Sequence, residues 1–85
     1  MKPEKIVLSL SNEQGQYLKN YPLHHTQKVI SETADEVILE LNFLISFDFV
    51  MELQSFGSNL KVVSPKRLIK TLVNNAKQVN EMYGK

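Results

Sequence analysis

Two adjacent histidines, His24 and His25, are the residues of this chain best suited to metal binding or proton transfer. Imidazole changes its charge near neutral pH and is a common metal ligand. Neighbouring side chains of an extended chain point in opposite directions, so one ion does not easily reach both rings. No ligand spacing such as HxxxH occurs nearby. We therefore expect no metal, and interpret the pair as the polar entrance to a strand that follows Pro22.

Three carboxylates, Glu32, Asp35 and Glu36, cluster where we expect a turn. Paired carboxylates do acid–base catalysis when burial or close approach separates their pKa values, whereas turns lie at the surface and are solvated. The chain has no cysteine, no GxSxG nucleophile motif and no phosphate-binding glycine loop. These observations point to no catalytic residue and no cofactor.

A basic cluster in the segment PKRLIK is the strongest candidate for binding. On a helix Lys66 and Lys70 lie one turn apart, with Arg67 beside them, and such a patch can contact phosphates. The alternative is a solvated helix face that needs no partner. The preceding segment, NLKVVS, lacks the aromatic residues on which an RNA-binding sheet stacks bases.

Length and charge describe a small globular chain. The 85 residues suffice for a single domain, residues 1–85, and 42% of them are apolar. The formal net charge of +1 creates no strong global attraction to nucleic acid or a membrane. No apolar run approaches the ~20 residues of a membrane span, and the start MKPEKIVLSL does not read as a signal peptide. We expect a cytoplasmic protein, or part of one, that has no membrane partner.

Hydrophobic periodicity predicts four strands and three helices. The strands are expected over residues 4–10, 26–31, 36–44 and 59–64, and the helices over 12–20, 47–56 and from 65 onwards. Ser11 and Ser46 are the predicted N-caps of the first two helices, Gly57 closes the second, and Ser64 caps the third with Pro65 at its first position. The third helix has a long apolar stripe: Leu68, Ile69, Leu72, Val73, Ala76 and Val79.

This order of elements predicts an α+β fold, a ferredoxin-like βαββαβ sandwich with an additional C-terminal helix. A four-stranded, mostly antiparallel sheet would lie under two helices. The extra helix would either cover the open face of the sheet or pack against something outside this chain.

Several segments of the sequence, taken in order, resemble the recurring motifs of a known family. They are KIVLSL, YLKNYPLHHTQKV, VILELNF, ELQSFGSNLKVVSP and SPKRLIKTLV, and they span nearly all 85 residues. The chain is similar to the WCX domain, the C-terminal extension of bacterial WYL-domain transcriptional regulators. The matching positions are Pro22, His25, Thr26 and Gln27, and later Gly57, Val62, Val63, Ser64, Pro65 and Leu68.

The resemblance implies a regulatory module of a longer, DNA-binding regulator and not an enzyme. Upstream helix-turn-helix and WYL domains of the same chain would be its neighbours, and the parent protein would be a homodimer. The effector would be a single-stranded nucleic acid or a small molecule. From the local basic cluster we expect Lys66, Arg67 and Lys70 to contact it, and from the loop before the second strand His25 and Gln27. The alternative is a stand-alone ferredoxin-like domain that binds a small molecule, or a small enzyme, with a pocket around His24, His25 and Glu40.

Overall fold

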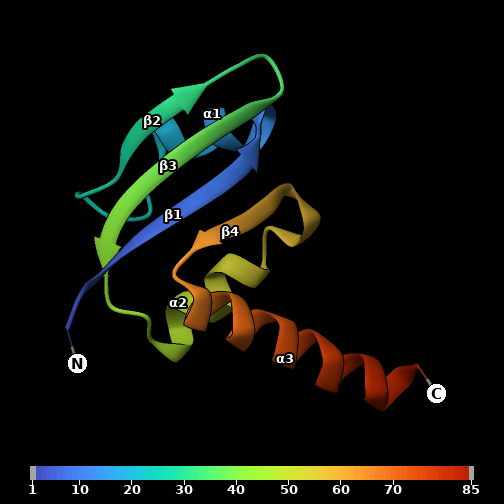
Figure 1. Cartoon of the computed structure of the whole chain (residues 1–85). Coiled ribbons are helices and arrows are strands. Elements are labelled where there is room, and N and C mark those ends of the chain that lie inside the picture. Colours follow the sequence, from blue (N-terminus) through green and yellow to red (C-terminus); the bar gives the residue numbers. More distant parts are fainter. Residues whose placement is uncertain (1, 85) are drawn as a thin grey trace.

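One long strand, β1 (Glu4–Ser11), lies inside the sheet and pairs with a neighbour along each of its edges (Figure 1). The computed structural model describes residues 2–84. After β1 the chain forms α1 (Asn12–Asn20), β2 (Lys28–Glu32), β3 (Glu36–Phe43), α2 (Phe47–Gln54), a 3-10 turn (Gly57–Asn59), β4 (Leu60–Ser64) and α3 (Lys66–Tyr83).

The four strands form one antiparallel sheet in the order β2-β3-β1-β4. The central pair is in continuous register, from Glu4 opposite Phe43 to Ser11 opposite Glu36. With three helices, this gives a mixed α+β fold, as the sequence predicts. The finer assignment, the ferredoxin-like pattern, stays a prediction.

A single core fills one face of the sheet, because the central strands alternate strictly between buried and outward-facing residues. The buried residues of these strands are Ile6, Leu8 and Leu10 in β1 and Val37, Leu39 and Leu41 in β3. The helices add Leu18, Phe49, Val50, Leu53 and Leu68 to the same cluster. All three helices therefore pack on this face, and α3 does not cover the opposite one.

Only the beginning of α3 is built into the body of the protein. Leu68 is fully buried, whereas Val73 is 62% exposed and Val79 is 52% exposed. In Figure 1 the helix runs away from the sheet towards the C-terminus. The apolar stripe predicted from the sequence is thus present, but only its first half packs on the core, through Leu68, Ile69 and Leu72, whereas Val73, Ala76 and Val79 are exposed.

The first helix approaches the sheet closely because it carries Gly15. A Cβ atom at this position would overlap the side chain of Val37 in β3. Glycine costs a helix up to about 1 kcal/mol relative to alanine, and here it allows the helix to lie against the strand. The N-cap is Ser11, as expected, whose Oγ accepts a hydrogen bond from the Gln14 N–H at 3.4 Å.

Three predicted boundaries are wrong. β2 begins at Lys28 rather than at residue 26, because the side chains of the two preceding residues tie a loop together. α2 ends at Gln54, where the Ser55 N–H bonds to the carbonyls of Met51 and Glu52; Gly57, with φ of 60°, then opens the 3-10 turn.

The third error concerns the start of α3. Its N-cap is Pro65, without a side-chain hydrogen bond, and not Ser64. The reason is that Ser64 is still paired with Val7 as part of β4, so its backbone belongs to the strand.

Candidate functional site

The predicted contact residues lie at one end of the sheet but at opposite edges. The loop with His25 and Gln27 leads into β2, whereas Lys66, Arg67 and Lys70 follow the end of β4. Neighbouring strands are about 4.8 Å apart, so three spacings place the two edges about 14 Å from each other. No hydrogen bond or ion pair joins the two groups within residues 2–84, so they form two surfaces rather than one site.

In the loop, Gln27 acts as a brace for the end of α1. Its Nε2 donates to the carbonyl of Leu18 at 2.8 Å, and its Oε1 accepts from the N–H of Leu23 at 2.9 Å. The last carbonyls of a helix have no intrahelical partner and need one elsewhere. Both ends of the Gln27 amide are therefore engaged within the chain.

The two histidines lie side by side at this loop. The rings of His24 and His25 are 4.2 Å apart, and His24 also packs 4.6 Å from Phe43. Its Nδ1 is 2.8 Å from the Thr26 hydroxyl, which in turn bonds to the backbone of Asn42 at the end of β3. The ring of His24 thus holds the loop to the sheet, whereas His25 is exposed.

No group of three His, Asp or Glu side chains that could hold a metal occurs between residues 2 and 84. The alternative hypothesis places His24, His25 and Glu40 around one pocket, but within residues 2–84 these side chains do not converge. His24 packs on Phe43, whose side chain shares the core face of β3, whereas Glu40 points to the opposite face. There Glu40 lies 3.5 Å from Lys5 and 3.6 Å from Lys28. The sheet therefore separates the imidazoles from this carboxylate.

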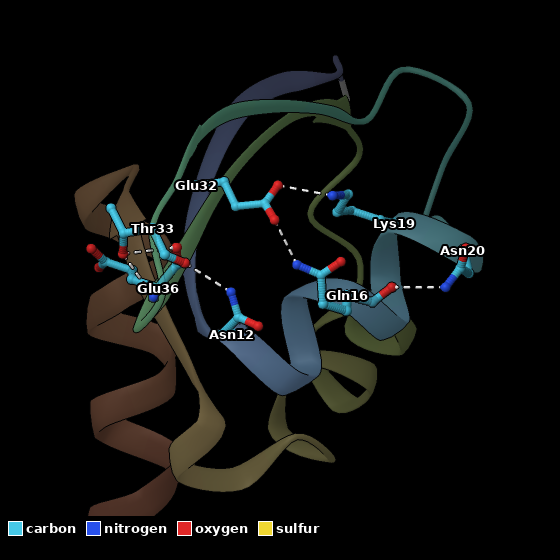
Figure 2. Close-up of polar contacts among 7 residues, drawn as sticks. All are labelled: Asn12, Gln16, Lys19, Asn20, Glu32, Thr33 and Glu36. Carbon is cyan, nitrogen blue, oxygen red and sulfur yellow. Dashed lines mark hydrogen bonds and ion pairs between the residues drawn. The ribbon is translucent and has the colours of Figure 1, made fainter.

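Two of the carboxylates near the β2–β3 turn, Glu32 and Glu36, are bound by side chains of other elements (Figure 2). Figure 2 shows Glu32 between Lys19, at 2.8 Å, and Gln16, at 2.7 Å, both from α1. The hydrogen bond from Lys19, followed by that from Gln16, lowers the pKa of the Glu32 carboxyl. Lys19 donates to one carboxylate oxygen of Glu32 and Gln16 donates to the other. Glu32 therefore ties the edge strand β2 to the helix α1.

The turn itself is held by further polar contacts. Asn12 donates to the carbonyl of Thr33 at 2.8 Å, and the Thr33 hydroxyl accepts from the N–H groups of Asp35 and Glu36. The Glu36 carboxylate accepts from the Ser9 hydroxyl. These contacts give the carboxylates of Glu32 and Glu36 a structural role.

The basic cluster of α3 contains one ion-paired side chain, Arg67, and two lysines, Lys66 and Lys70, that have no ion-pair partner within residues 2–84. Arg67 forms an ion pair with Glu4, and the hydrogen bond that its guanidinium group donates to this carboxylate raises the pKa of Arg67. Lys66 and Lys70 are exposed, and neither has an ion-pair partner between residues 2 and 84. The salt bridge could not be inferred from the sequence, because 63 positions separate its two residues.

The basic side of α3 extends beyond the predicted contact residues to Lys77. A shallow hollow runs along α3 and is lined by Ile69, Lys70, Val73, Asn74 and Lys77. The signal was the helical spacing of residues 70, 74 and 77, which puts Lys77 two turns beyond Lys70 on the same side.

A second depression lies between α2 and α3. Its lining is apolar apart from three amide side chains, and consists of Phe47, Met51, Gln54, Asn75, Gln78, Val79 and Met82. Neither depression brings together groups that could do acid–base or nucleophilic chemistry.

The family comparison agrees with the resemblance seen in the sequence. The family model of the WCX domain matches residues 2–79, and no curated protein matches the chain. This family is a regulatory domain family and not a known enzyme family. No helix between residues 2 and 84 has the length and apolar character to cross a bilayer. Since the match covers nearly the whole sequence, the chain belongs to the WCX domain family, which suggests a regulatory module of WYL-type regulators.

Proposed function

We propose that this chain is a non-enzymatic module of a WYL-type bacterial transcriptional regulator, where it helps to pair subunits and to respond to an effector. The observation that carries the proposal is the WCX match over residues 2–79. In the parent protein the module follows helix-turn-helix and WYL domains, which bind DNA and sense the effector together with it. We assign it the ferredoxin-like fold, which its order of elements and strands supports.

The basic end of α3 fits an extended polyanion better than a small effector. Lys66 and Lys70 project one turn apart from a surface without a deep cavity, and lysines at such spacing contact successive phosphates. A small molecule is normally bound in a concave pocket that buries most of its surface. We therefore propose a single-stranded nucleic acid as the effector, with His25 as the exposed residue of the other contact surface.

The test is the fluorescence anisotropy of a labelled single-stranded oligonucleotide at low salt. Replacing two phosphate-binding lysines, as in Lys66→Ala with Lys70→Ala, should weaken binding and reduce the slope of log K against log salt by about 1 to 2. The matched control is Lys28→Ala with Lys61→Ala, which removes the same charge from the sheet. Arg67→Ala should cost less affinity than Lys66→Ala, because Glu4 already occupies Arg67.

Two results would count against the nucleic-acid part of the proposal. One is the absence of binding at low salt. The other is an equal loss of affinity in the α3 double variant and in the sheet control, because that would indicate attraction without a defined site.

A further inference from the structure

The depression between α2 and α3 exposes several large apolar side chains to solvent. Four of its seven lining residues are apolar and more than half exposed: Phe47 at 77%, Met51 at 52%, Val79 at 52% and Met82 at 73%. Contiguous exposed apolar surface on a small protein commonly marks an interaction site. We call the seven residues that line this depression the α2–α3 groove.

Methionine supplies half of the apolar side chains of the groove. Met51 lies on the α2 wall and Met82 on the α3 wall, and the only other methionine of the chain is Met1. The unbranched thioether side chain adapts its shape to the groups that pack on it, and methionine is used at surfaces that bind partner helices. The groove is therefore suited to the apolar side chains of a protein partner.

Both walls of the groove are helical, and this favours a helix as the occupant. The walls run from Phe47 to Gln54 on α2 and from Asn75 to Met82 on α3, a rise of seven residues in each case, or about 10 Å. An extended peptide needs main-chain partners for its N–H and C=O groups, and the side of a helix does not supply them. A partner helix satisfies these groups internally and presents apolar residues at positions i, i+3 or i+4, and i+7.

The charged side chains next to the groove are acidic. Asp48 and Glu52 on α2 and Glu81 on α3 are sequence neighbours of groove residues. All three are exposed, and none of them has an ion-pair partner between residues 2 and 84. The helix α2 contains no basic residue. A partner that enters the groove therefore meets unpaired negative charge at its edges.

The lysines of α3 lie on the opposite side of that helix. Val79 in the groove follows Lys70 by nine residues, which is two and a half turns and places the two side chains on opposite sides. Lys66 and Lys77, four residues before Lys70 and seven residues after it, share the side of Lys70. The surface assigned to the nucleic acid and the groove are thus two separate surfaces of one helix.

We propose that the α2–α3 groove binds an amphipathic helix of a partner protein, with apolar residues on one face and lysine or arginine residues beside them. The charges decide among the possible occupants. The carboxylates of Asp48, Glu52 and Glu81 repel a nucleic acid or an anionic membrane surface, whereas they attract the basic residues of such a helix. This inference goes beyond the proposed function, because it uses none of the residues assigned to the effector.

The first experiment measures the fluorescence anisotropy of two labelled 14-residue peptides in the presence of the 85-residue chain. One peptide consists of leucine and lysine, with leucine on one face of the helix and lysine on the other. The second peptide has glutamate in place of every lysine. At physiological ionic strength the chain should bind the lysine peptide at least tenfold more tightly than the glutamate peptide. Equal affinities, or no binding of the lysine peptide, contradict the inference.

The second experiment locates the binding surface with substitutions that leave the net charge unchanged. Met51→Gln with Val79→Gln should weaken binding of the lysine peptide at least tenfold, because both apolar contacts are lost. The matched control is Ile30→Gln with Val63→Gln on the sheet, where the native side chains are similarly exposed, at 50% and 48%. Far-UV circular dichroism verifies that each variant is folded. An equal loss of affinity in the two variants places the peptide outside the groove and refutes the inference.

The third experiment tests the acidic edge. Asp48→Asn with Glu52→Gln should weaken binding of the lysine peptide at least threefold and reduce its preference over the glutamate peptide. Glu13→Gln with Asp35→Asn is the control, because it removes the same charge from exposed positions away from the groove. Equal effects of the two variants would indicate attraction to the overall charge of the chain and not to the edge of the groove.

The remaining outcomes separate the partner helix from a second copy and from the effector. Sedimentation equilibrium of the chain alone measures self-association. A dimer that Met51→Gln with Val79→Gln abolishes would show that a second copy occupies the groove, contrary to the inference. The same variant should bind the oligonucleotide as the native chain does, because the lysines lie on the opposite side of α3. A loss of both oligonucleotide and peptide binding contradicts two separate surfaces, whereas a failure of peptide binding alone leaves the effector role intact.

Discussion

The two ends of the helical layer are fixed in different ways. On one side, α1 and β2 are joined by side-chain hydrogen bonds of Gln16, Lys19 and Gln27, and most of these polar groups find partners inside the chain. On the other side, α3 is anchored through Leu68, and its lysines and its outer apolar residues are left without partners within residues 2–84. On the α1 side, polar residues that the sequence offers as candidates for binding or catalysis, such as Gln27 and Glu32, therefore hold parts of the fold together.

This difference indicates where an interaction surface should be sought. A side chain whose hydrogen-bonding groups are all satisfied gains little from a ligand, because binding must first break existing contacts. An exposed lysine or apolar residue gains from any partner that removes it from water or neutralises it. We therefore propose that the α2–α3 side is the interacting side of the module and that the α1–β2 side is its scaffold.

The largest expected effect tests the anchor of α3. Leu68→Ala removes a fully buried side chain from the core and should lower the free energy of unfolding by about 2–5 kcal/mol. Val79→Ala, eleven positions further along the same helix, should change it by less than about 0.5 kcal/mol, since Val79 is 52% exposed. Urea unfolding at low protein concentration measures both. Similar losses would mean that the whole helix is anchored, and would remove the contrast between the two sides.

The sequence predicts the centre of the molecule better than either side. In β1 and β3 every second residue is apolar, and this period alone determines which face is buried. On α3 the same reasoning identifies an apolar stripe, but periodicity does not say what covers it, and the body of the protein ends near Leu72. The extent of burial depends on tertiary packing that no local pattern encodes.

The candidate site was predicted only in outline. The spacing of Lys66, Arg67 and Lys70 places them together, but it cannot show that Glu4 occupies Arg67 from the far end of the chain. For Gln27, the contact with the carbonyl of Leu18 depends on how the intervening loop closes. In both cases a long-range contact decides whether a polar residue is free to bind.

A smaller effect is expected where α1 touches the sheet. Gly15→Ala places a Cβ atom against Val37, and the resulting strain should exceed the gain in helix propensity and lower the free energy of unfolding by about 1–2 kcal/mol. The exposed position Glu13 of the same helix serves as the control, and Glu13→Ala should change it by less than about 0.5 kcal/mol. A stabilised Gly15→Ala variant would show that α1 is not closely packed, contrary to the scaffold role.

The loop offers a comparison of similar size between two of its predicted contact residues. Gln27→Ala leaves the Leu18 carbonyl and the Leu23 N–H without their partner and should cost about 1–3 kcal/mol in urea unfolding. His25→Ala should cost less than about 0.5 kcal/mol, because its ring is exposed and stacks only on His24. Equal stability of the two variants would contradict the bracing role of Gln27 and return it to the candidates for ligand contact.

The smallest effect concerns the pH dependence of the contact between α1 and β2. The hydrogen bond from Lys19 lowers the pKa of Glu32 in the folded chain below its unfolded value. The ionised carboxylate therefore stabilises the fold above the unfolded pKa, and this contribution is lost as the pH falls through the lower, folded value. The melting temperatures of the native chain and of Glu32→Gln should differ at pH 7 and converge towards about pH 3.

The same convergence is expected for Lys19→Met, because Lys19 is the main cause of the lowered pKa. Acid therefore loosens the scaffold side through a specific pair of residues. A difference between native chain and Glu32→Gln that stays constant from pH 7 to pH 3 would mean that the ion pair contributes nothing. The edge strand β2, all of whose residues are exposed, would then depend on its backbone pairing with β3 and on neutral hydrogen bonds. In that case the α1–β2 side and the α2–α3 side would still differ in the side chains that they expose. The ion pair of Glu32 and Lys19 would no longer distinguish how the α1–β2 side is held together.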